Sequence, residues 1–231
     1  MVARGIPGAH PAPIAVEPMR TILVANAKGG SGKTTLATHI AGWLAGKRQR
    51  VVLADRDPQR SASEWLARRP PLFPPIIGLP PGAKKGELRG YDPQYVVVDT
   101  PAGLRGDDLD DAVRAADLML VPVSPSAFDM AATGRFLRAI AGAKPVKRGT
   151  LAVGFVAMRV DARTVSAGEL DAFLAAAGYP LVAHLRDAQI YVHCARDGAT
   201  VFDLPRSRAE QDWEQWRPLT RWIARQAAPS P

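Results

Sequence analysis

The sequence predicts an α/β protein whose doubly wound, mostly parallel sheet carries helices on both faces. Short runs of aliphatic and β-branched residues alternate along the chain with longer segments of helical periodicity. The short runs are apolar throughout, which is typical of parallel strands that are buried on both sides. Right-handed crossovers would bring the carboxyl ends of these strands to one edge of the sheet, where ligands bind in such folds.

The expected elements follow one another in a regular order. Apolar runs predict strands at residues 21–25, 51–55, 76–79, 95–99, 118–123, 151–158 and 181–184. Helical periodicity predicts helices at 33–47, 61–67, 107–115, 127–141, 166–177 and 206–226. The first helix, for example, places Leu36, Ile40 and Leu44 on one face. Because no repeat and no internal boundary is visible, we expect a single domain over residues 19–227.

The composition narrows the classes of protein and partner. The 231 residues are 47% apolar and carry a net charge of +8, which favours an anionic partner such as nucleic acid, phosphates or an acidic membrane surface. The single cysteine, Cys194, excludes an internal disulfide and a multi-cysteine metal site, and it favours a reducing cytosol. Residues 1–18 are rich in proline and predict a flexible tail rather than a signal peptide, and residues 228–231 predict a disordered end.

A glycine-rich loop joins the first expected strand to the first expected helix. Its sequence, NAKGGSGKTT at residues 26–35, fits the phosphate-binding pattern G-x-x-x-x-G-K-[ST], except that Ala27 replaces the first glycine. The loop backbone and the helix N-terminus would surround phosphate oxygens. The alternative is a turn without a ligand, which the strand–loop–helix context disfavours. The expected phosphate ligands are Gly29, Gly30, Ser31, Gly32, Lys33, Thr34 and Thr35, with Lys33 at the β- and γ-phosphates and Thr34 at Mg²⁺.

The segment KGGSGKTT resembles the deviant Walker A loop of the ParA/MinD family of P-loop ATPases. In that family the additional lysine, here Lys28, reaches across a homodimer interface to the nucleotide of the opposite subunit. The resemblance therefore implies a catalytic role for Lys28 together with Lys33, and ATP with Mg²⁺ as cofactors. Without the resemblance, Lys28 would be interpreted as a solvated surface lysine. The short chain is most similar to the small ParA-type partition and positioning ATPases.

Two acidic residues follow the second expected strand, in VVLADRDPQ. Asp55 and Asp57 are similar to the D-x-D-P-Q segment of the family. The resemblance implies that Asp57 orients the attacking water and that Asp55 supports the Mg²⁺ shell, in a reaction that consists mainly of positioning and charge stabilisation. The alternative is that one or both carboxylates cap the helix expected from Ser61.

A third acidic residue ends the strand YVVVD. Three valines followed by Asp99 form a Walker B pattern, whose carboxylate would hold a Mg²⁺-bound water. The segment VVVDTPAG also resembles the family loop that senses the γ-phosphate. The alternative interpretation is a simple N-cap aspartate.

The nucleobase is expected to lie near residues 121–130 and 155–164. The second segment resembles one in which an asparagine of the family often contacts the base, but Met158 stands at that position here. Arg159 would lie over the base or be solvated.

Basic residues gather towards the end of the chain. By resemblance to partition proteins, Arg186, Arg206 and Arg208 would bind DNA without sequence preference, and Arg217, Arg221 and Arg225 extend the charge along the last helix. The alternative is a solvated helix face.

The last helix also carries apolar residues at helical spacing, namely Trp213, Trp216, Leu219 and Ile223. We expect them to dock on the core, while a membrane-bound helix is the second interpretation. Pro218 is expected to kink this helix.

The leading functional hypothesis is a ParA-like ATPase. Its ATP-bound sandwich dimer would hold nucleoid DNA in the cytoplasm, and a ParB-like or other adaptor would stimulate hydrolysis while a cargo is positioned. The alternatives are a membrane-bound spatial regulator of the MinD type and a metabolic or metal-chaperone P-loop enzyme. The single cysteine disfavours the metal chaperone.

Overall fold

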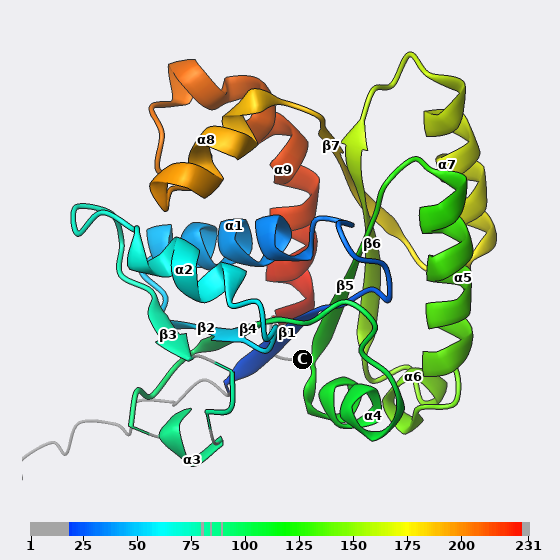
Figure 1. Cartoon of the computed structure of the whole chain (residues 1–231), viewed down its shortest axis with the longest axis horizontal. Coiled ribbons are helices and arrows are strands. Elements are labelled where there is room, and N and C mark those ends of the chain that lie inside the picture. Colours follow the sequence, from blue (N-terminus) through cyan, green and yellow to red (C-terminus); the bar gives the residue numbers. More distant parts are fainter. Residues whose placement is uncertain (1–18, 80, 84, 89, 228–231) are drawn as a thin grey trace, which may run out of the picture.

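The computed structural model describes residues 19–227 except 80, 84 and 89, so the tail expected at 1–18 and the end expected at 228–231 lie outside the described residues. Seven strands form one sheet in the order β3-β2-β4-β1-β5-β6-β7 (Figure 1), and every neighbouring pair is parallel. The predicted fold class is therefore confirmed. The strands are β1 (Arg20–Val24), β2 (Val51–Asp55), β3 (Ile77–Leu79), β4 (Tyr95–Asp99), β5 (Leu118–Val123), β6 (Ala152–Val160) and β7 (Leu181–Arg186).

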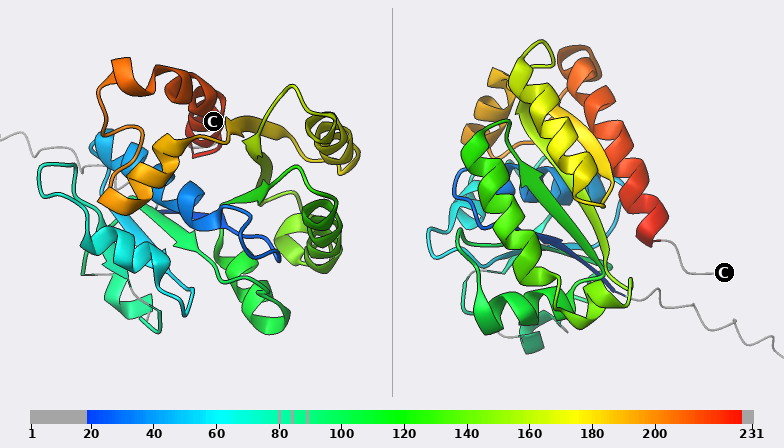
Figure 2. Two further views of the ribbon diagram at one scale, coloured as in Figure 1. Left: turned by 45° about the horizontal axis from the view of Figure 1, so that its top comes forward. Right: turned by 90° about the vertical axis from the view of Figure 1, so that its right-hand side faces the viewer.

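Helices cover both faces of this sheet (Figure 1). One face is covered by α1 (Lys33–Gly46), α2 (Ser61–Ala67), α8 (Gln189–Asp197) and α9 (Arg206–Ala227). The other face is covered by α4 (Gly106–Ala115), α5 (Ala127–Ile140) and α7 (Val165–Ala176). Two short helices, α3 (Lys85–Leu88) and α6 (Lys144–Lys147), lie in connections. The right-hand view of Figure 2 shows α9 along one edge of the molecule.

The apolar strands supply side chains to both cores. Ile22 and Leu53 point to the side of α1 and α9, whereas Leu23 and Met119 point to the side of α5 and α7, and all four are at most 1% exposed. Full burial of such a side chain contributes roughly 1.5–3 kcal/mol. The rigid sheet that results fixes the positions of the loops at its carboxyl edge.

The last helix differs from the expectation in one detail. Its dihedral angles leave the helical region at Ala209 rather than at Pro218, so the predicted kink at the proline was wrong. A proline removes a hydrogen bond to the carbonyl four residues earlier. That carbonyl belongs to Glu214, which is exposed, so water can replace the lost donor.

Helix α8 was not predicted from the sequence. Only Cys194 of its nine residues is buried, so burial required few apolar residues in this short helix. Gly198 ends the helix with φ 64°, and a Cβ at this position would lie 2.4 Å from the Arg69 nitrogen, which explains the requirement for glycine.

Candidate functional site

The carboxyl ends of three adjacent strands assemble the candidate site. Asp99 of β4 is in register with Val24 of β1 on one side and with Asp55 of β2 on the other. The glycine-rich loop leaves β1 at this edge, and the main-chain N–H of Gly103 donates to the carbonyl of Ala27, joining the loop after β4 to the glycine-rich loop. The sheet order therefore brings together the three segments that the sequence singled out.

Glycines give the loop its shape. Gly30 and Gly32 have φ angles of 74° and 93°, and a Cβ on Gly32 would lie 2.8 Å from Cε of Met158. Gly32 also precedes α1, which among the described residues has neither a side-chain cap nor an acidic residue in its first turn. Its first N–H groups therefore point into the site with their partial positive charge, as an anion requires.

Lys33 lies folded back over the loop. Its Nζ donates a 3.0 Å hydrogen bond to the carbonyl of Lys28, which also accepts from Oγ of Ser31 at 3.2 Å. Burial lowers the pKa of Lys33, and the nearby charges of Asp99 and Asp57 oppose that effect. A buried ammonium with one neutral acceptor is suited to bind an anion that enters the loop.

Thr34 and Asp99 form an oxygen-rich pair beside Lys33. Oγ1 of Thr34 donates a 2.7 Å hydrogen bond to Oδ2 of Asp99. The other oxygen, Oδ1, is buried and has no hydrogen-bond partner among the described residues. Burial, above all, raises the pKa of Asp99 to about 7.

This pair fits a Mg²⁺ ion. Mg²⁺ binds through one or two carboxylates, phosphate oxygens and retained waters rather than through an all-protein cage. In agreement, the part of the chain that the structure describes holds no group of three or more His, Cys, Asp or Glu residues that could bind a metal alone.

Asp55 has a different environment from Asp99. It is 1% exposed, and its carboxylate accepts hydrogen bonds from the Asp57 N–H at 3.0 Å and from both the N–H and Oγ of Ser63 at 2.8 Å. These contacts anchor the first turn of α2, as in the capping interpretation of the sequence. Its role in the metal shell stays a prediction, because both oxygens already have partners.

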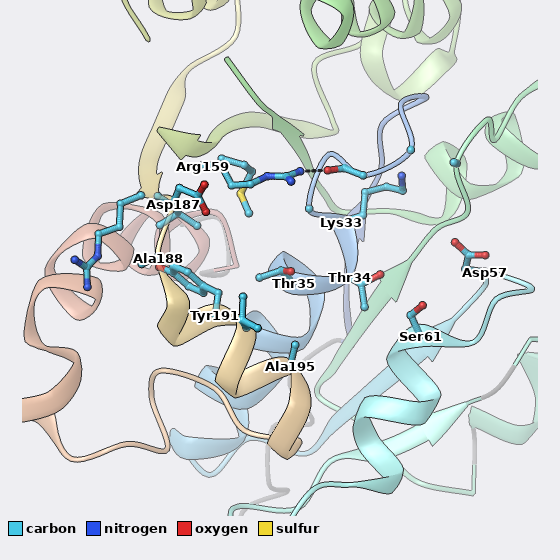
Figure 3. Close-up of a pocket in the computed structure, with 18 of the residues that line it drawn as sticks. Lys33, Thr34, Thr35, Asp57, Ser61, Arg159, Asp187, Ala188, Tyr191 and Ala195 are labelled. Carbon is cyan, nitrogen blue, oxygen red and sulfur yellow. Dashed lines mark hydrogen bonds between the residues drawn. The ribbon is translucent and has the colours of Figure 1, made fainter. Parts of the chain in front are cut away.

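Asp57 is half-buried and faces the loop. Its Oδ1 accepts from the Gln59 N–H at 3.0 Å, and its charge acts on the pKa of Lys33. Figure 3 shows Asp57 and Ser61 on the right side of the cavity and Tyr191 and Arg159 on the left. The carboxylate is thus placed beside the space into which a terminal phosphate would project.

A cavity of about 630 Å³ extends from the loop to α8. This volume lies within the roughly 300–1,000 Å³ of small-molecule sites. The far end is lined by Leu185, Arg186, Asp187, Ala188, Tyr191, Val192 and Ala195. Residues 121–130 do not line it, and their place beside the base stays a prediction. The spacing of Ala188, Tyr191, Val192 and Ala195 along one helix face is the signal that could have indicated this wall.

Met158 and Arg159 line the same cavity close to the loop. They belong to the end of β6, where the pairing with β7 is irregular, and Arg159 has a φ angle of 54°. Nη2 of Arg159 donates to the carbonyl of Gly30. The structure thus links both residues to the loop, and a role in contacting the base stays a prediction.

Lys28 is placed differently from Lys33. Its main chain lies in the loop, but the side chain is not part of the cavity wall and forms no ion pair among the described residues. The Lys28 N–H lies 3.4 Å from Oδ1 of Asn26. Asn26 is buried, and its Nδ2 donates to the Pro122 carbonyl at 2.8 Å and to Oγ1 of Thr133 at 2.9 Å. Sequence reasoning missed this anchoring residue.

Comparison with known families agrees with this geometry. Residues 22–200 match the model of the CobQ/CobB/MinD/ParA nucleotide binding domain. The chain belongs to this family.

Sequence relatives lie within the ParA branch. The chain is 30% identical to the chromosome-partitioning ATPase Soj of Thermus thermophilus, over 68% of this chain and 76% of Soj. It is 29% identical to maintenance of carboxysome distribution protein A of Halothiobacillus neapolitanus, over 83% of this chain and 91% of the relative. A protein of the same name from Gloeobacter kilaueensis is 40% identical over 48% of this chain, and the match spans only 52% of that relative.

Solved structures share the fold at lower identity. Apo McdA of Cyanthece has a TM-score of 0.70 and 17% identity, with 87% of this chain and 98% of McdA covered. MinD of Aquifex aeolicus has a TM-score of 0.67 and 20% identity, with 92% and 98% covered.

The arginines of this ParA/MinD-type chain fall into two groups. Arg186 forms a two-point ion pair with Asp212, and Arg206 and Arg217 both bind Glu214 at 2.8 Å. By contrast, Arg208, Arg221 and Arg225 are exposed and form no ion pair within the described residues. Arg186 therefore lies between the cavity and α9 with its side chain 33% exposed, and its role in DNA binding stays a prediction.

The apolar residues of α9 dock on the core, as expected. Trp216, Leu219 and Ile223 are fully buried, and Trp213 is half-buried against Phe202. The tryptophans that suggested a membrane-bound helix are thus occupied by packing. Among the described residues, no helix combines the length and the apolarity that a bilayer crossing needs.

Proposed function

We propose that this chain is a ParA-type positioning ATPase that forms a sandwich dimer around two ATP molecules. The observation that carries this proposal is the position of Lys28, which belongs to the phosphate loop yet stands outside the wall of its own cavity. A lysine in this position can serve the phosphates of a second subunit. Relatives in the same family include the partitioning ATPase Soj, which supports the assignment.

Different groups of residues would bind different parts of ATP. The loop N–H groups and Lys33 bind phosphates, and α8 forms the wall beside the base and ribose. Thr34 and Asp99 would hold Mg²⁺ through the hydroxyl and the carboxylate that lie beside Lys33. When bound, Mg²⁺ neutralises the charge that develops on the phosphates. Asp57 orients the attacking water, and Lys28 of the partner copy stabilises the transferred charge.

Sequence-independent binding to DNA is the second part of the proposal. Arg208, Arg221 and Arg225 are free to contact phosphates, and the net charge of +8 adds long-range attraction. Arg206 and Arg217 share one glutamate, so this cluster keeps a net positive charge. A dimer would present two such surfaces, and the avidity of two sites would strengthen binding.

An adaptor protein would stimulate hydrolysis and release the dimer from the nucleoid in the cytoplasm. The cargo that moves with the adaptor is a plasmid, a chromosome or a protein assembly. Two relatives are named for carboxysome distribution and another for chromosome partitioning, so both kinds of cargo are represented.

A DNA mobility shift with ATP, ADP or no nucleotide tests this function. We expect a shift of random-sequence duplex DNA with ATP and little or none in the other two conditions. Equal shifts in all three would contradict nucleotide-controlled DNA binding. Binding to anionic vesicles but not to DNA in the presence of ATP would instead support the MinD-type alternative.

A further inference from the structure

Two residues at the far end of the cavity depend on a helix that does not touch the cavity. Arg186 ends β7 and Tyr191 lies on α8, and both line the wall opposite the phosphate loop. Figure 3 shows Tyr191 projecting from α8 beside the cavity. The polar side-chain partners of both residues belong to α9, which contributes no described residue to the cavity wall, and the Tyr191 ring also packs against His39 of α1 at 5.4 Å between ring centroids.

Asp212 of α9 is the partner of Arg186. Its carboxylate is fully buried and accepts two hydrogen bonds of 2.9 Å, from Nε and Nη2 of the guanidinium. This two-point geometry fixes the plane of the guanidinium as well as its position. The Arg186 N–H also donates to Oε1 of Gln215 at 3.0 Å, so α9 holds both the main chain and the side chain.

Tyr191 is held from the same helix. Its hydroxyl accepts a 3.1 Å hydrogen bond from Nε1 of Trp216, and its proton is directed to the Asp212 carboxylate. Burial raises the pKa of Tyr191, and the negative charge of Asp212 raises it further, which places that carboxylate near the hydroxyl. The tyrosine ring can therefore turn away from its present position only by breaking contacts with α9.

We propose that Asp212 is a positioning residue for the nucleoside end of the site, where it holds Arg186 and Tyr191 against the base or ribose of the bound nucleotide. Asp212 does not touch the ligand. The inference rests on the ATP site proposed above and adds a distinction between its two ends. The phosphate end is built by α1 and the loop, and Asp212 makes no hydrogen bond or ion pair to them among the described contacts.

Two ligands distinguish binding at the phosphate end from binding at the nucleoside end. ATP would occupy both ends, whereas inorganic tripolyphosphate would occupy only the phosphate end. Binding of each to the full chain is measured by titration calorimetry with Mg²⁺. In Asp212→Asn we expect the Kd for ATP to rise about tenfold, as for the loss of a charge-assisted pair, and the Kd for tripolyphosphate to stay within about twofold.

Asp203 provides a matched control. It also forms a buried two-point pair, with Arg69, at 2.9 Å for both hydrogen bonds, and both side chains are at most 4% exposed. Arg69 does not line the cavity. Asp203 also accepts from the N–H and Oγ1 of Thr200 at 2.8 and 2.7 Å, so Asp203→Asn disturbs a more buried pair than Asp212→Asn does. It should nevertheless leave the ratio of the two affinities unchanged.

Tyr191→Phe provides a second test if Asp212→Asn does not fold. It keeps the ring and removes only the hydroxyl, so we expect about threefold weaker ATP binding with unchanged tripolyphosphate binding. Equal losses for both ligands, or no loss for either, would overturn the role of Asp212. If the wild-type chain bound tripolyphosphate and ATP equally weakly, the ATP site itself would be wrong, which is a separate result.

Discussion

Thr34 and Asp99 are joined by a 2.7 Å hydrogen bond although 65 positions separate them in the sequence. The bond links the first turn of α1 to the end of β4, and it leaves Oδ1 of Asp99 buried without a partner among the described residues. An oxygen in that state is stabilised by a cation or by a water that a cation holds. The pair is therefore where the proposed ATP site would hold Mg²⁺.

Asp99→Asn should reduce the effect of Mg²⁺ on ATP binding. The neutral amide cannot offset the charge of the ion, so we expect the gain in ATP affinity on adding Mg²⁺ to fall by about tenfold or more. Affinity in EDTA should be equal to that of the wild type or higher, because one negative charge near the phosphates is gone. Calorimetry with and without EDTA measures both, and an undiminished Mg²⁺ effect would exclude this metal position.

Asp57→Ala should separate binding from hydrolysis. The carboxylate faces the terminal phosphate but contributes little to holding it, so ATP affinity should change by less than about threefold while turnover falls by about a hundredfold or more. Phosphate release and nucleotide titration give the two quantities. Asp110→Ala, an exposed acid on α4, serves as the control. Turnover equal to that of the control would remove Asp57 from the mechanism.

His39 should make stability depend on pH. Its ring stacks on Trp216 at 5.2 Å, and burial lowers its pKa from 6.5 to about 4. Between these values the unfolded chain binds a proton that the folded chain does not. The contribution of His39 to the free energy of unfolding is therefore present in full above pH 6.5. It is lost as the pH falls towards 4, and the loss is about 3 kcal/mol at most.

His39→Phe keeps an aromatic ring and removes the titration. Urea unfolding at several pH values should give a shallower loss of stability for the variant than for the wild type between pH 6.5 and 4. Two parallel curves would show that His39 does not titrate in this way.

Arg208→Glu combined with Arg221→Glu should weaken DNA binding. Both side chains are exposed and unpaired among the described residues, so the change removes phosphate contacts without breaking an ion pair. We expect at least about tenfold weaker binding and a smaller slope of log affinity against log salt. Arg135→Glu combined with Arg138→Glu is the matched control, since these two exposed arginines of α5 lie on the other face of the sheet and form no ion pair among the described residues. Equal losses in both variants would indicate a general charge effect.

The sequence predicted the sheet well because its strands are continuous apolar runs. The ranges of β2, β4 and β5 agree with the expected 51–55, 95–99 and 118–123. Helix α8 escaped prediction because it is short and mostly exposed, although it forms one wall of the cavity. The phosphate end of the site was predictable because a local motif encodes it, whereas the nucleoside end combines residues from β7, α8 and α9.

Hydrogen bonds between residues far apart in the sequence explain why the contacts of Arg186 and Asp55 were not predicted. Nothing near Arg186 in the sequence indicates Asp212, 26 residues later, so the ion pair that holds Arg186 beside the cavity was not predicted. Asp55 lies in the predicted motif, yet its contacts with Ser63 depend on how α2 docks. A motif thus predicts which residues gather at the carboxyl edge of the sheet. Tertiary packing determines which of their polar atoms have a hydrogen-bond partner within the protein and which can bind a ligand.

The proposed sandwich dimer requires that two copies close over ATP with Lys28 of each serving the other. Sedimentation of Asp57→Ala with ATP and Mg²⁺, with and without the added change Lys28→Ala, shows whether the association depends on this lysine. We expect a dimer for the single variant and a monomer for the double variant, with both binding ATP. A dimer of equal stability in both, or a monomer in both, would rule out this role of Lys28.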